Sequence, residues 1–326
     1  MSLNGKRILI TGGTGSFARH FLQHILPLKP ESIRIYSRDE HKQTELLGCY
    51  GGIKGGTDNI VRGFIGDIRD LSRLRMAMEG IDIVIHAAAL KQVQSCEYNP
   101  IETIKTNIYG SQNVIQAALD CNVEKVLAIS TDKAVAPLNL YGSTKMVMEK
   151  LVTNANSYRG KNHRTKFSST RYGNVADSRG TVAHIWQEQI SKGEPISITD
   201  FNATRFWLTM AEANQFVVEC LDLMDELDGG EIFCPRIPSV TIRSIFNAIV
   251  PPNHDYKEIG QRIGDKLHEY LILKEELAHT TLFKGKYVIM PENPSWPYRE
   301  PLRIKPNIKE GINMTSENNE NFLDAE

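Results

Sequence analysis

The sequence predicts an α/β protein with a doubly wound parallel sheet and a smaller carboxyl-terminal lobe, and three observations support this prediction. Short β-rich segments alternate with amphipathic helical segments through the first half of the chain. A glycine-rich turn joins the first strand to the first helix. Prolines between residues 195 and 297 divide the second half into small elements, which is typical of a lobe that does not continue the alternation.

The expected elements follow from hydrophobic periodicity. Six strands are expected at residues 7–11, 32–37, 61–65, 81–86, 125–130 and 166–172. Helices are expected between them, most clearly at residues 16–25, 71–78 and 103–119. The helix at 103–119 is apolar on more than one face, so two roles stay open: a core helix, or a helix that pairs subunits in a bundle.

Composition excludes several classes of protein. The chain has 326 residues, 41% of them hydrophobic, which is enough to bury a large core. Lys and Arg number 38 against 39 Asp and Glu, so no net charge favours nucleic acid or an anionic membrane as a partner. The five scattered cysteines form no C-x-x-C pair, which indicates reduced thiols in the cytoplasm. We expect no secretion signal and no membrane anchor.

The glycine-rich turn, T-G-G-T-G-S-F-A at residues 11–18, predicts a dinucleotide site. Gly12 permits a tight turn, and Gly15 lets the backbone approach a pyrophosphate at the helix amino terminus. The alternative is a plain connection between strand and helix, but the order of strand, turn and helix favours a Rossmann-type fold. The cofactor contacts expected here are Gly12, Thr14, Gly15, Ser16 and Phe17.

The tips of the next strands predict which dinucleotide binds. Ser37 and Arg38 follow the second strand, where an NAD site would place a carboxylate for the ribose 2′-hydroxyl. A serine and an arginine can instead hold a 2′-phosphate, so NADP is the expected cofactor. The alternative is that Arg38 pairs with a neighbouring surface carboxylate, Asp39 or Glu40. Further cofactor contacts are expected from Asp67 and Ile68, after the third strand, and from Ala87 and Ala88, after the fourth.

The most informative pattern is S-T-D-K at residues 130–133, followed by Y-G-S-T-K at residues 141–145. Tyr141 and Lys145 share one helix face, so the Lys145 ammonium is expected to lower the pKa of the tyrosine while it holds the nicotinamide ribose. Thr131, at the carboxyl end of a strand, can reach a substrate oxygen. Alone, this spacing is typical of an ordinary helix face, and its place behind a dinucleotide turn gives it meaning.

These motifs, together with H-A-A-A-L-K, R-Y-G-N-V, T-R-F-W and G-D-K-L-H-E, resemble the inverting UDP-N-acetylglucosamine 4,6-dehydratases of the extended short-chain dehydrogenase/reductase superfamily. The resemblance runs from about residue 6 to about residue 291. Its most specific part is Asp132-Lys133, because sugar 4-epimerases share the tyrosine and lysine without this acid and base. The sequence departs from the family at Ala18, where a glycine is common, and at Ile263, where a proline is usual. The second departure leaves UDP or GDP open as the nucleotide.

The resemblance implies a chemistry for each catalytic residue. Tyr141 takes the proton of the sugar 4-hydroxyl while C4 is oxidised, and the resulting ketone acidifies the C5 hydrogen. Lys133, if burial and the cationic nicotinamide nearby keep it neutral, is expected to remove the C5 proton, and Asp132, if protonated, is expected to assist loss of the C6 hydroxyl. The alternatives of the same fold are an epimerase or a reductase. A catalytically idle NADP-binding scaffold is the alternative from another class.

Several residues are expected to bind the nucleotide-sugar substrate. Lys91 and Asn174 follow strands and are expected near its diphosphate, with Lys91 also near the cofactor. Arg205 and Arg262 are expected to clamp phosphates, the alternative being surface ion pairs, and Asp265 to meet the ribose. His268 and Glu269 are assigned to packing or the base pocket, since no third ligand indicates a metal.

The domain organisation follows from these assignments. Residues 1–174 are expected to form the NADP-binding domain, with later segments returning to it, and residues 175–312 mainly the substrate-binding lobe. Residues 313–326 are expected to form a flexible tail, because this polar segment has too little apolar surface to offset its ordering entropy. A homo-oligomer, a dimer or higher, is the expected assembly.

Overall fold

The structure, a computed structural model, describes residues 3–50, 60–160, 163–176, 178, 180–299 and 314–323. The first half of the chain contributes six strands to a large sheet: β1 (Arg7–Thr11), β2 (Ser32–Ser37), β3 (Val61–Ile65), β4 (Ile83–His86), β5 (Lys125–Ile129) and β6 (Lys166–Thr170). Three more come from the second half: β10 (Ile232–Cys234), β14 (Thr280–Phe283) and β15 (Lys286–Ile289).

The strand order of this sheet is β14-β15-β10-β6-β5-β4-β1-β2-β3. All pairs from β3 to β10 are parallel, and β15 runs antiparallel to both of its neighbours. The chain therefore builds outward from β1 in one direction and from β4 in the other, so the crevice for a ligand lies where these two strands meet. This topology confirms the predicted doubly wound α/β fold.

Helices cover both faces of the sheet. The helices α1 (Ser16–Ile25) and α9 (Met210–Glu226) pack on one face, in a core that includes Phe21 and Phe216. The other face is covered by α3 (Leu71–Met78), α6 (Gly110–Asp120) and α7 (Leu140–Ala155), which meet the sheet around Val114 and Met148. The remaining short helices are η1 (Leu26–Leu28), α2 (Glu40–Gly48), α4 (Val93–Tyr98), α5 (Pro100–Ile104), η2 (Lys105–Tyr109), η3 (Asp132–Ala134) and α11 (Lys274–Leu277).

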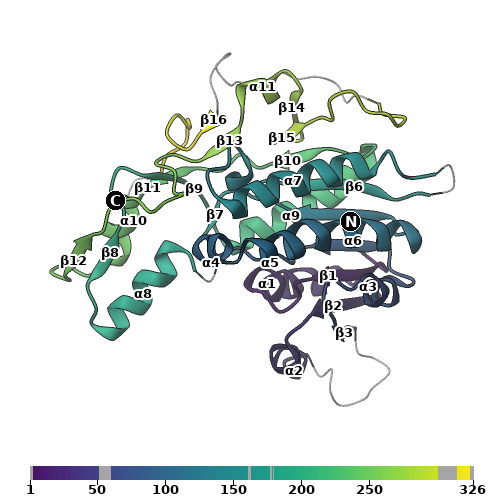
Figure 1. The fold of residues 1–326 in the computed structure, drawn as a ribbon, viewed down its shortest axis with the longest axis horizontal. Helices are drawn as coiled ribbons and strands as arrows, with labels where there is room; N and C mark the ends of the chain where they lie inside the picture. Colours follow the sequence, from purple (N-terminus) through teal and green to yellow (C-terminus); the bar gives the residue numbers. More distant parts are fainter. Residues whose placement is uncertain are drawn as a thin grey trace.

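A smaller lobe lies to the left of the large sheet in Figure 1. It contains α8 (Val182–Lys192), β8 (Ile196–Ile198), α10 (Ile242–Ile249) and β12 (Tyr256–Glu258). Its own core gathers around Trp186, Phe201 and Ile245. A three-stranded sheet of β7 (Asn174–Val175), β9 (Thr204–Leu208) and β11 (Ser239–Thr241), in the order β11-β9-β7, begins directly after β6. The division of domains at residue 174 stays a prediction.

Two expectations differ from the structure. The helix expected at residues 103–119 is divided into α5, a π-helical turn at η2, and α6, and α6 packs against α3 and α7. A flexible tail was expected at residues 314–323, but this segment packs on the protein. Its strand β16 (Met314–Thr315) pairs with β13 (Tyr270–Ile272), and Ser316 is fully buried. Backbone pairing and the Ser316 hydroxyl hold this polar segment, so apolar burial was the wrong criterion.

All five cysteines lie in the described residues and are free thiols. In the part of the chain that the structure describes, no helix combines the length and the apolar character that crossing a bilayer requires.

Candidate active site

The glycine-rich turn lies against the loop that follows β4. Gly12 has a φ of 68°, and a Cβ there would lie 2.9 Å from the Ala88 Cα, so a side chain would displace the loop. The turn is closed by the Gly15 amide, which donates to the Gly12 carbonyl at 2.9 Å. Gly15 then caps α1, whose first amides point out of the turn. The fold thus presents backbone donors at the crevice between β1 and β4.

The tip of β2 presents a mixed set of charges. The Ser37 hydroxyl accepts from the Gln43 side chain at 3.0 Å. The Arg38 guanidinium is more than half exposed and lies 3.8 Å from the Asp67 carboxylate, so its partner is neither of the neighbours considered from the sequence. Asp67 is also held by Arg69 at 2.7 Å. Arg38 therefore already has a carboxylate neighbour, and the roles of Arg38 toward a phosphate and of Asp67 toward adenine stay predictions.

The helix α7, which carries Tyr141 and Lys145, is fixed at its first turn. The Asn139 side chain accepts from the Gly142 amide at 2.8 Å, and the Glu97 carboxylate accepts from the Leu140 amide at 2.6 Å. A Cβ at Gly142 would lie 2.2 Å from the Lys133 carbonyl oxygen, so only glycine lets the helix approach η3 this closely. These contacts bring the two motifs, residues 130–133 and 141–145, into one rigid unit.

A cavity of about 470 Å³ opens at this unit. The predicted site residues that line it come from both halves of the chain: Phe17, Ala87, Lys91, Thr131, Lys133, Tyr141, Lys145, Asn174, Arg262 and Asp265. The other predicted residues do not line this cavity: Gly12, Thr14, Gly15, Ser16, Ser37, Arg38, Asp67, Ile68, Ala88, Asp132 and Arg205. Most of the second group belong to the glycine-rich turn and the strand tips beside it.

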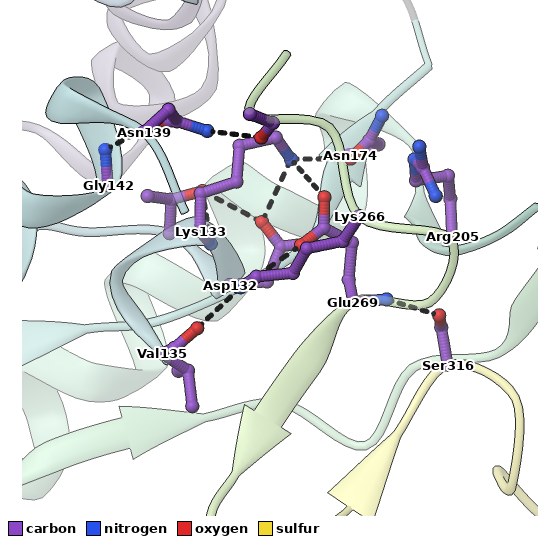
Figure 2. Close-up of polar contacts among 12 residues, drawn as sticks. Asp132, Lys133, Val135, Asn139, Gly142, Asn174, Arg205, Lys266, Glu269 and Ser316 are labelled. Carbon is purple, nitrogen blue, oxygen red and sulfur yellow. Dashed lines mark hydrogen bonds and ion pairs between the residues drawn. The ribbon is translucent and has the colours of Figure 1, made fainter. Parts of the chain in front are cut away.

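The Lys133 ammonium lies at the centre of a polar cluster (Figure 2). Its Nζ is 3.1 Å from Asp132 Oδ1, 3.2 Å from Asn174 Oδ1 and 3.4 Å from Glu269 Oε1. Asp132 is completely buried, and its Oδ1 also accepts from the Thr131 hydroxyl at 2.9 Å. Lys133 remains partly accessible from the cavity, so Asp132 lies behind the lysine and the threonine.

Burial and charge act in opposite directions on this cluster. Burial raises the pKa of Asp132, the negative charge of Glu269 adds to this, and Lys133 opposes it. For Lys133, burial lowers the pKa, but Asp132 and Glu269 outweigh it, and the pKa is raised. Burial alone therefore does not keep Lys133 neutral, because two carboxylates face the amine, and the part expected of the cationic nicotinamide stays a prediction.

The expected effect of Lys145 on Tyr141 also differs from the structure. Burial raises the pKa of Tyr141 to about 12, and the charge that opposes the rise comes from Lys133. Lys145 donates to the Ile129 carbonyl at 2.7 Å, and burial lowers its pKa to about 8. In this state Tyr141 is a neutral phenol, which can donate a hydrogen bond to a ligand oxygen before it takes part in proton transfer.

Among the predicted substrate contacts, Lys91, Arg262 and Asp265 line the cavity, whereas Arg205 does not. Lys91 donates to the Ser178 hydroxyl at 2.9 Å across the mouth of the cavity. Arg262 and Asp265 line the cavity from a loop that the Asn139 side chain holds by donating to the Gly264 carbonyl at 2.9 Å. Arg205 lies on β9, where it donates to two backbone carbonyls, of Thr204 at 2.7 Å and of Leu267 at 3.0 Å. Its predicted role as a phosphate clamp stays a prediction.

Glu269 is the residue whose place sequence reasoning missed. It was assigned to packing or the base pocket, but it is almost fully buried and faces Lys133. Lys266, also buried, is 3.7 Å from Glu269 and donates to the Val135 carbonyl at 2.5 Å. The motif at residues 264–269 contained the only signal, and nothing local shows that it folds back onto residues 131–135. His268 contacts Thr204 through Nδ1 at 2.9 Å.

The parallel sheet, the glycine-rich turn and the tyrosine and lysine on α7 define an extended short-chain dehydrogenase/reductase fold. The chain belongs to the polysaccharide biosynthesis protein family, whose profile matches residues 8–291. This family match agrees with the resemblance inferred from the sequence motifs.

Named relatives make the comparison more specific. The chain is 44% identical over 97% of its length to a UDP-N-acetylglucosamine 4,6-dehydratase (inverting) of Campylobacter jejuni serotype O:23/36, of which 94% is covered. It is 47% identical over 88% of its length to the protein of the same name from serotype O:2, of which 84% is covered. The X-ray structure of Pen from Bacillus thuringiensis superposes with a TM-score of 0.86 at 33% identity, covering 98% of this chain and 96% of that one.

Proposed function

We propose that this protein is an NADP-dependent nucleotide-sugar 4,6-dehydratase that acts on UDP-N-acetylglucosamine and inverts C5. The observation that carries the proposal is the contact between a buried carboxyl, Asp132, and a cavity-lining amine, Lys133, at 3.1 Å, beside Tyr141. A dehydration across C5–C6 needs one base and one acid at neighbouring atoms, and this pair supplies both. The names of the two Campylobacter relatives support the same activity.

The residues present fit a dinucleotide. The space over Gly12 is free of a side chain, the first turn of α1 offers amides, and Arg38 is exposed at the tip of β2. We propose that Gly12, Thr14, Gly15, Ser16 and Phe17 hold the pyrophosphate, and that Ser37 and Arg38 hold a 2′-phosphate. Asp67, Ile68, Ala87 and Ala88 complete the adenosine side, while Lys91, Tyr141 and Lys145 hold the nicotinamide side. The bound nicotinamide would supply reversible hydride storage.

The proton steps follow from the cluster. Tyr141 first loses its own phenol proton to solvent; as a phenolate it then takes the proton of the 4-hydroxyl as C4 becomes a ketone, and the ketone acidifies the C5 hydrogen. Transfer of one proton from Lys133 Nζ to Asp132 Oδ1, over 3.1 Å, turns the ion pair into a free amine and a carboxylic acid. The amine removes the C5 proton. Asp132 does not line the cavity, so its proton reaches the C6 hydroxyl through Thr131. The Thr131 hydroxyl gives its proton to the C6 oxygen, which leaves as water, and takes a proton from Asp132, 2.9 Å away.

The same cluster separates this activity from epimerisation. A 4-epimerase oxidises and reduces C4 and needs no acid and base at C5–C6. A buried carboxyl whose pKa is raised, in contact with a lysine, is a costly arrangement that such a reaction does not require. We therefore favour the dehydratase over the epimerase or reductase of the same fold.

Substrate binding is proposed for the remaining cavity residues. Lys91 and Asn174 are assigned to the diphosphate, with Arg205 and Arg262 as further phosphate contacts and Asp265 at the ribose. The choice between UDP and GDP depends on the loop around Ile263, whose side chain is almost fully exposed at the cavity. We propose UDP, in agreement with the names of the relatives.

Incubation of the purified protein with UDP-N-acetylglucosamine in deuterated water tests the proposal. We expect a 6-deoxy-4-keto product that carries deuterium at C5, observed by NMR. A hexose of unchanged mass would show an epimerase, and unaltered substrate would contradict both. The GDP analogue in a parallel reaction tests the choice of nucleotide.

We also propose that the protein is a cytoplasmic homo-oligomer, a dimer or higher. Tyr98, Ile101 and Tyr109, on α4, α5 and η2, are each more than half exposed. Large apolar side chains gathered on neighbouring helices favour a protein partner. Light scattering after size exclusion measures the mass in solution, and a monomer mass would contradict this assembly.

A further inference from the structure

The third group around the Lys133 amine is Glu269, from the segment before β13. An ammonium has three N–H donors, and Lys133 Nζ faces three oxygens, those of Asp132, Asn174 and Glu269, at 3.1, 3.2 and 3.4 Å. Figure 2 shows the lysine pointing into the space between these side chains. Asp132 and Lys133 account for the acid and the base of the proposed reaction, so the second carboxylate requires a role of its own.

Glu269 has positively charged neighbours besides Lys133. Its Oε2 lies 3.7 Å from the Lys266 ammonium, and Arg205 adds a second positive charge nearby. The Ser316 hydroxyl accepts from the Glu269 amide at 2.9 Å and fixes the backbone. Burial raises the pKa of Glu269, but Lys133, Arg205 and Lys266 outweigh it, so the pKa is lowered. Lys266 and Arg205 therefore remain beside the Glu269 carboxylate whichever group of the neighbouring pair carries a proton.

The surroundings of the Asp132 carboxyl differ from those of the Glu269 carboxylate. Its Oδ1 meets Thr131 and Lys133, and within the described part of the chain its buried Oδ2 has no hydrogen-bond partner. Glu269 Oε2 also has no hydrogen-bond partner there, but it lies 3.7 Å from the Lys266 ammonium, whereas the ion pair of Asp132 is with Lys133 alone. An unpartnered carboxyl oxygen can carry a proton without breaking an existing contact. Of the two carboxylates beside Lys133, Asp132 is thus the one that can be protonated.

We propose that Glu269 is a positioning residue for the proposed dehydration. It anchors the Lys133 amine at the cavity, and its fixed negative charge keeps one proton within the Asp132–Lys133 pair. This proposal rests on the function proposed above. Without that proton the pair would still contain a base, but it would have no acid for the departing C6 hydroxyl.

Other charged or titratable side chains face the cluster from several elements. Lys266 lies on the segment of Glu269 itself, Arg205 lies on β9, and Tyr141 faces the pair from α7. Lys91, across the cavity, interacts with the charge of Lys133. Positive charge from Lys266 and negative charge from Glu269 must therefore act on Asp132 with opposite sign.

Two substitutions of opposite sign test the proposal. Glu269→Gln removes a negative charge at nearly constant shape, and Lys266→Met removes a positive charge. The protonation of Asp132 is followed by difference infrared spectroscopy of the carboxyl band, which is assigned by its loss in Asp132→Asn. We expect the midpoint pH to fall by about one unit in Glu269→Gln and to rise in Lys266→Met. Glu275→Gln, which changes an exposed residue of α11, is the control and should leave the midpoint pH of Asp132 unchanged.

The pH profile of kcat/KM is the second readout. In Glu269→Gln we expect its acid limb to move to lower pH together with the infrared midpoint. A residue with a purely structural role would lower activity at every pH without moving the limb. If Glu269→Gln does not fold, as judged by circular dichroism, Lys266→Met alone decides: a midpoint that stays in place overturns the proposal.

The infrared titration needs no turnover, so the two proposals can fail separately. Midpoints that shift with opposite sign, in a protein that makes no dehydrated sugar, would leave the charge of Glu269 established but contradict its part in dehydration and the proposed function. Dehydration by the wild-type protein, with unmoved midpoints in both variants, would overturn the assignment of Glu269 and leave the function intact.

Discussion

The dinucleotide turn and the catalytic cluster lie at the same edge of the sheet but are built in different ways. At the turn, the missing side chain of Gly12 lets the backbone pack on Ala88, and backbone hydrogen bonds from Gly15 to Gly12 and from Gly13 to Tyr36 hold the turn. At the cluster, the Lys133 ammonium is held by side chains, those of Asp132, Asn174 and Glu269. One site depends on the shape of the backbone, and the other depends on buried charge.

This difference decides how each site responds to substitution. A site made of backbone is sensitive to added atoms, whereas a site made of buried charges is sensitive to any unbalanced charge. The two sites can therefore be separated by experiment, because one class of change should affect cofactor binding and the other should affect chemistry.

Lys133→Met is expected to have the largest effect. It removes the base and keeps the volume of the side chain, so we expect kcat to fall about a thousand-fold. NADP affinity, measured by fluorescence titration, should change little, because Lys133 lies outside the glycine-rich turn. Parallel losses of NADP affinity and of kcat would show that the two sites are not separable.

Gly12→Ala tests the turn, with Gly5→Ala as a matched control. Both glycines have a φ of 68°, but a Cβ at Gly5 meets nothing within 4 Å, whereas at Gly12 it lies 2.9 Å from Ala88. Backbone strain is therefore shared, and overlap is present only at Gly12. We expect Gly12→Ala to lower the free energy of unfolding in urea by about 1–3 kcal/mol more than Gly5→Ala, and to weaken NADP binding. Equal effects of the two changes would contradict the close approach.

Lys145→Met tests the charge buried beside the catalytic tyrosine. The pKa of Lys145 is about 8 in the folded protein against 10.5 in the unfolded chain, so the cost of burying its charge is complete below pH 8 and fades toward pH 10. We expect the variant to gain stability over the wild type at pH 7, by about 2 kcal/mol more than at pH 10. Urea unfolding of the cofactor-free proteins measures this difference. A gain that does not change with pH would contradict the shift.

Arg38→Ala is expected to have the smallest effect and concerns cofactor choice alone. Loss of a charged contact to a 2′-phosphate should weaken NADP binding about ten-fold and leave NAD binding almost unchanged. The two dissociation constants measure this, with Lys42→Ala on the same surface as the control. Equal weakening for both cofactors would indicate that Arg38 acts only through Asp67, 3.8 Å away.

Sequence reasoning reached the parts of the fold that local patterns specify. The strands β1, β2 and β3 begin and end at the predicted residues, because a short apolar strand between turn residues is a local signal. The place of Tyr141 and Lys145 on one helix, α7, followed from their spacing of four residues. The pairing of Glu269 with Lys133 did not, because it joins segments 136 residues apart that only the folded lobe brings together.

The protonation states were also beyond the sequence. The spacing of Tyr141 and Lys145 indicated a lowered tyrosine pKa, but burial raises it to about 12. Whether burial or a neighbouring charge prevails depends on depth and distance, which no spacing in the sequence supplies. The same holds for residues 314–323, whose docking depends on β13 and a buried Ser316.

The path of hydrogen between two carbons of one sugar tests the central claim most directly. UDP-N-acetylglucosamine labelled with deuterium at C4 is incubated with the NADP-loaded protein in ordinary water, without further cofactor, and the product is examined by NMR. The account predicts that the deuterium appears in the new methyl group at C6 of a 4-keto sugar. Recovery of the deuterium at C4 of an intact hexose, with the C6 hydroxyl retained, would contradict it.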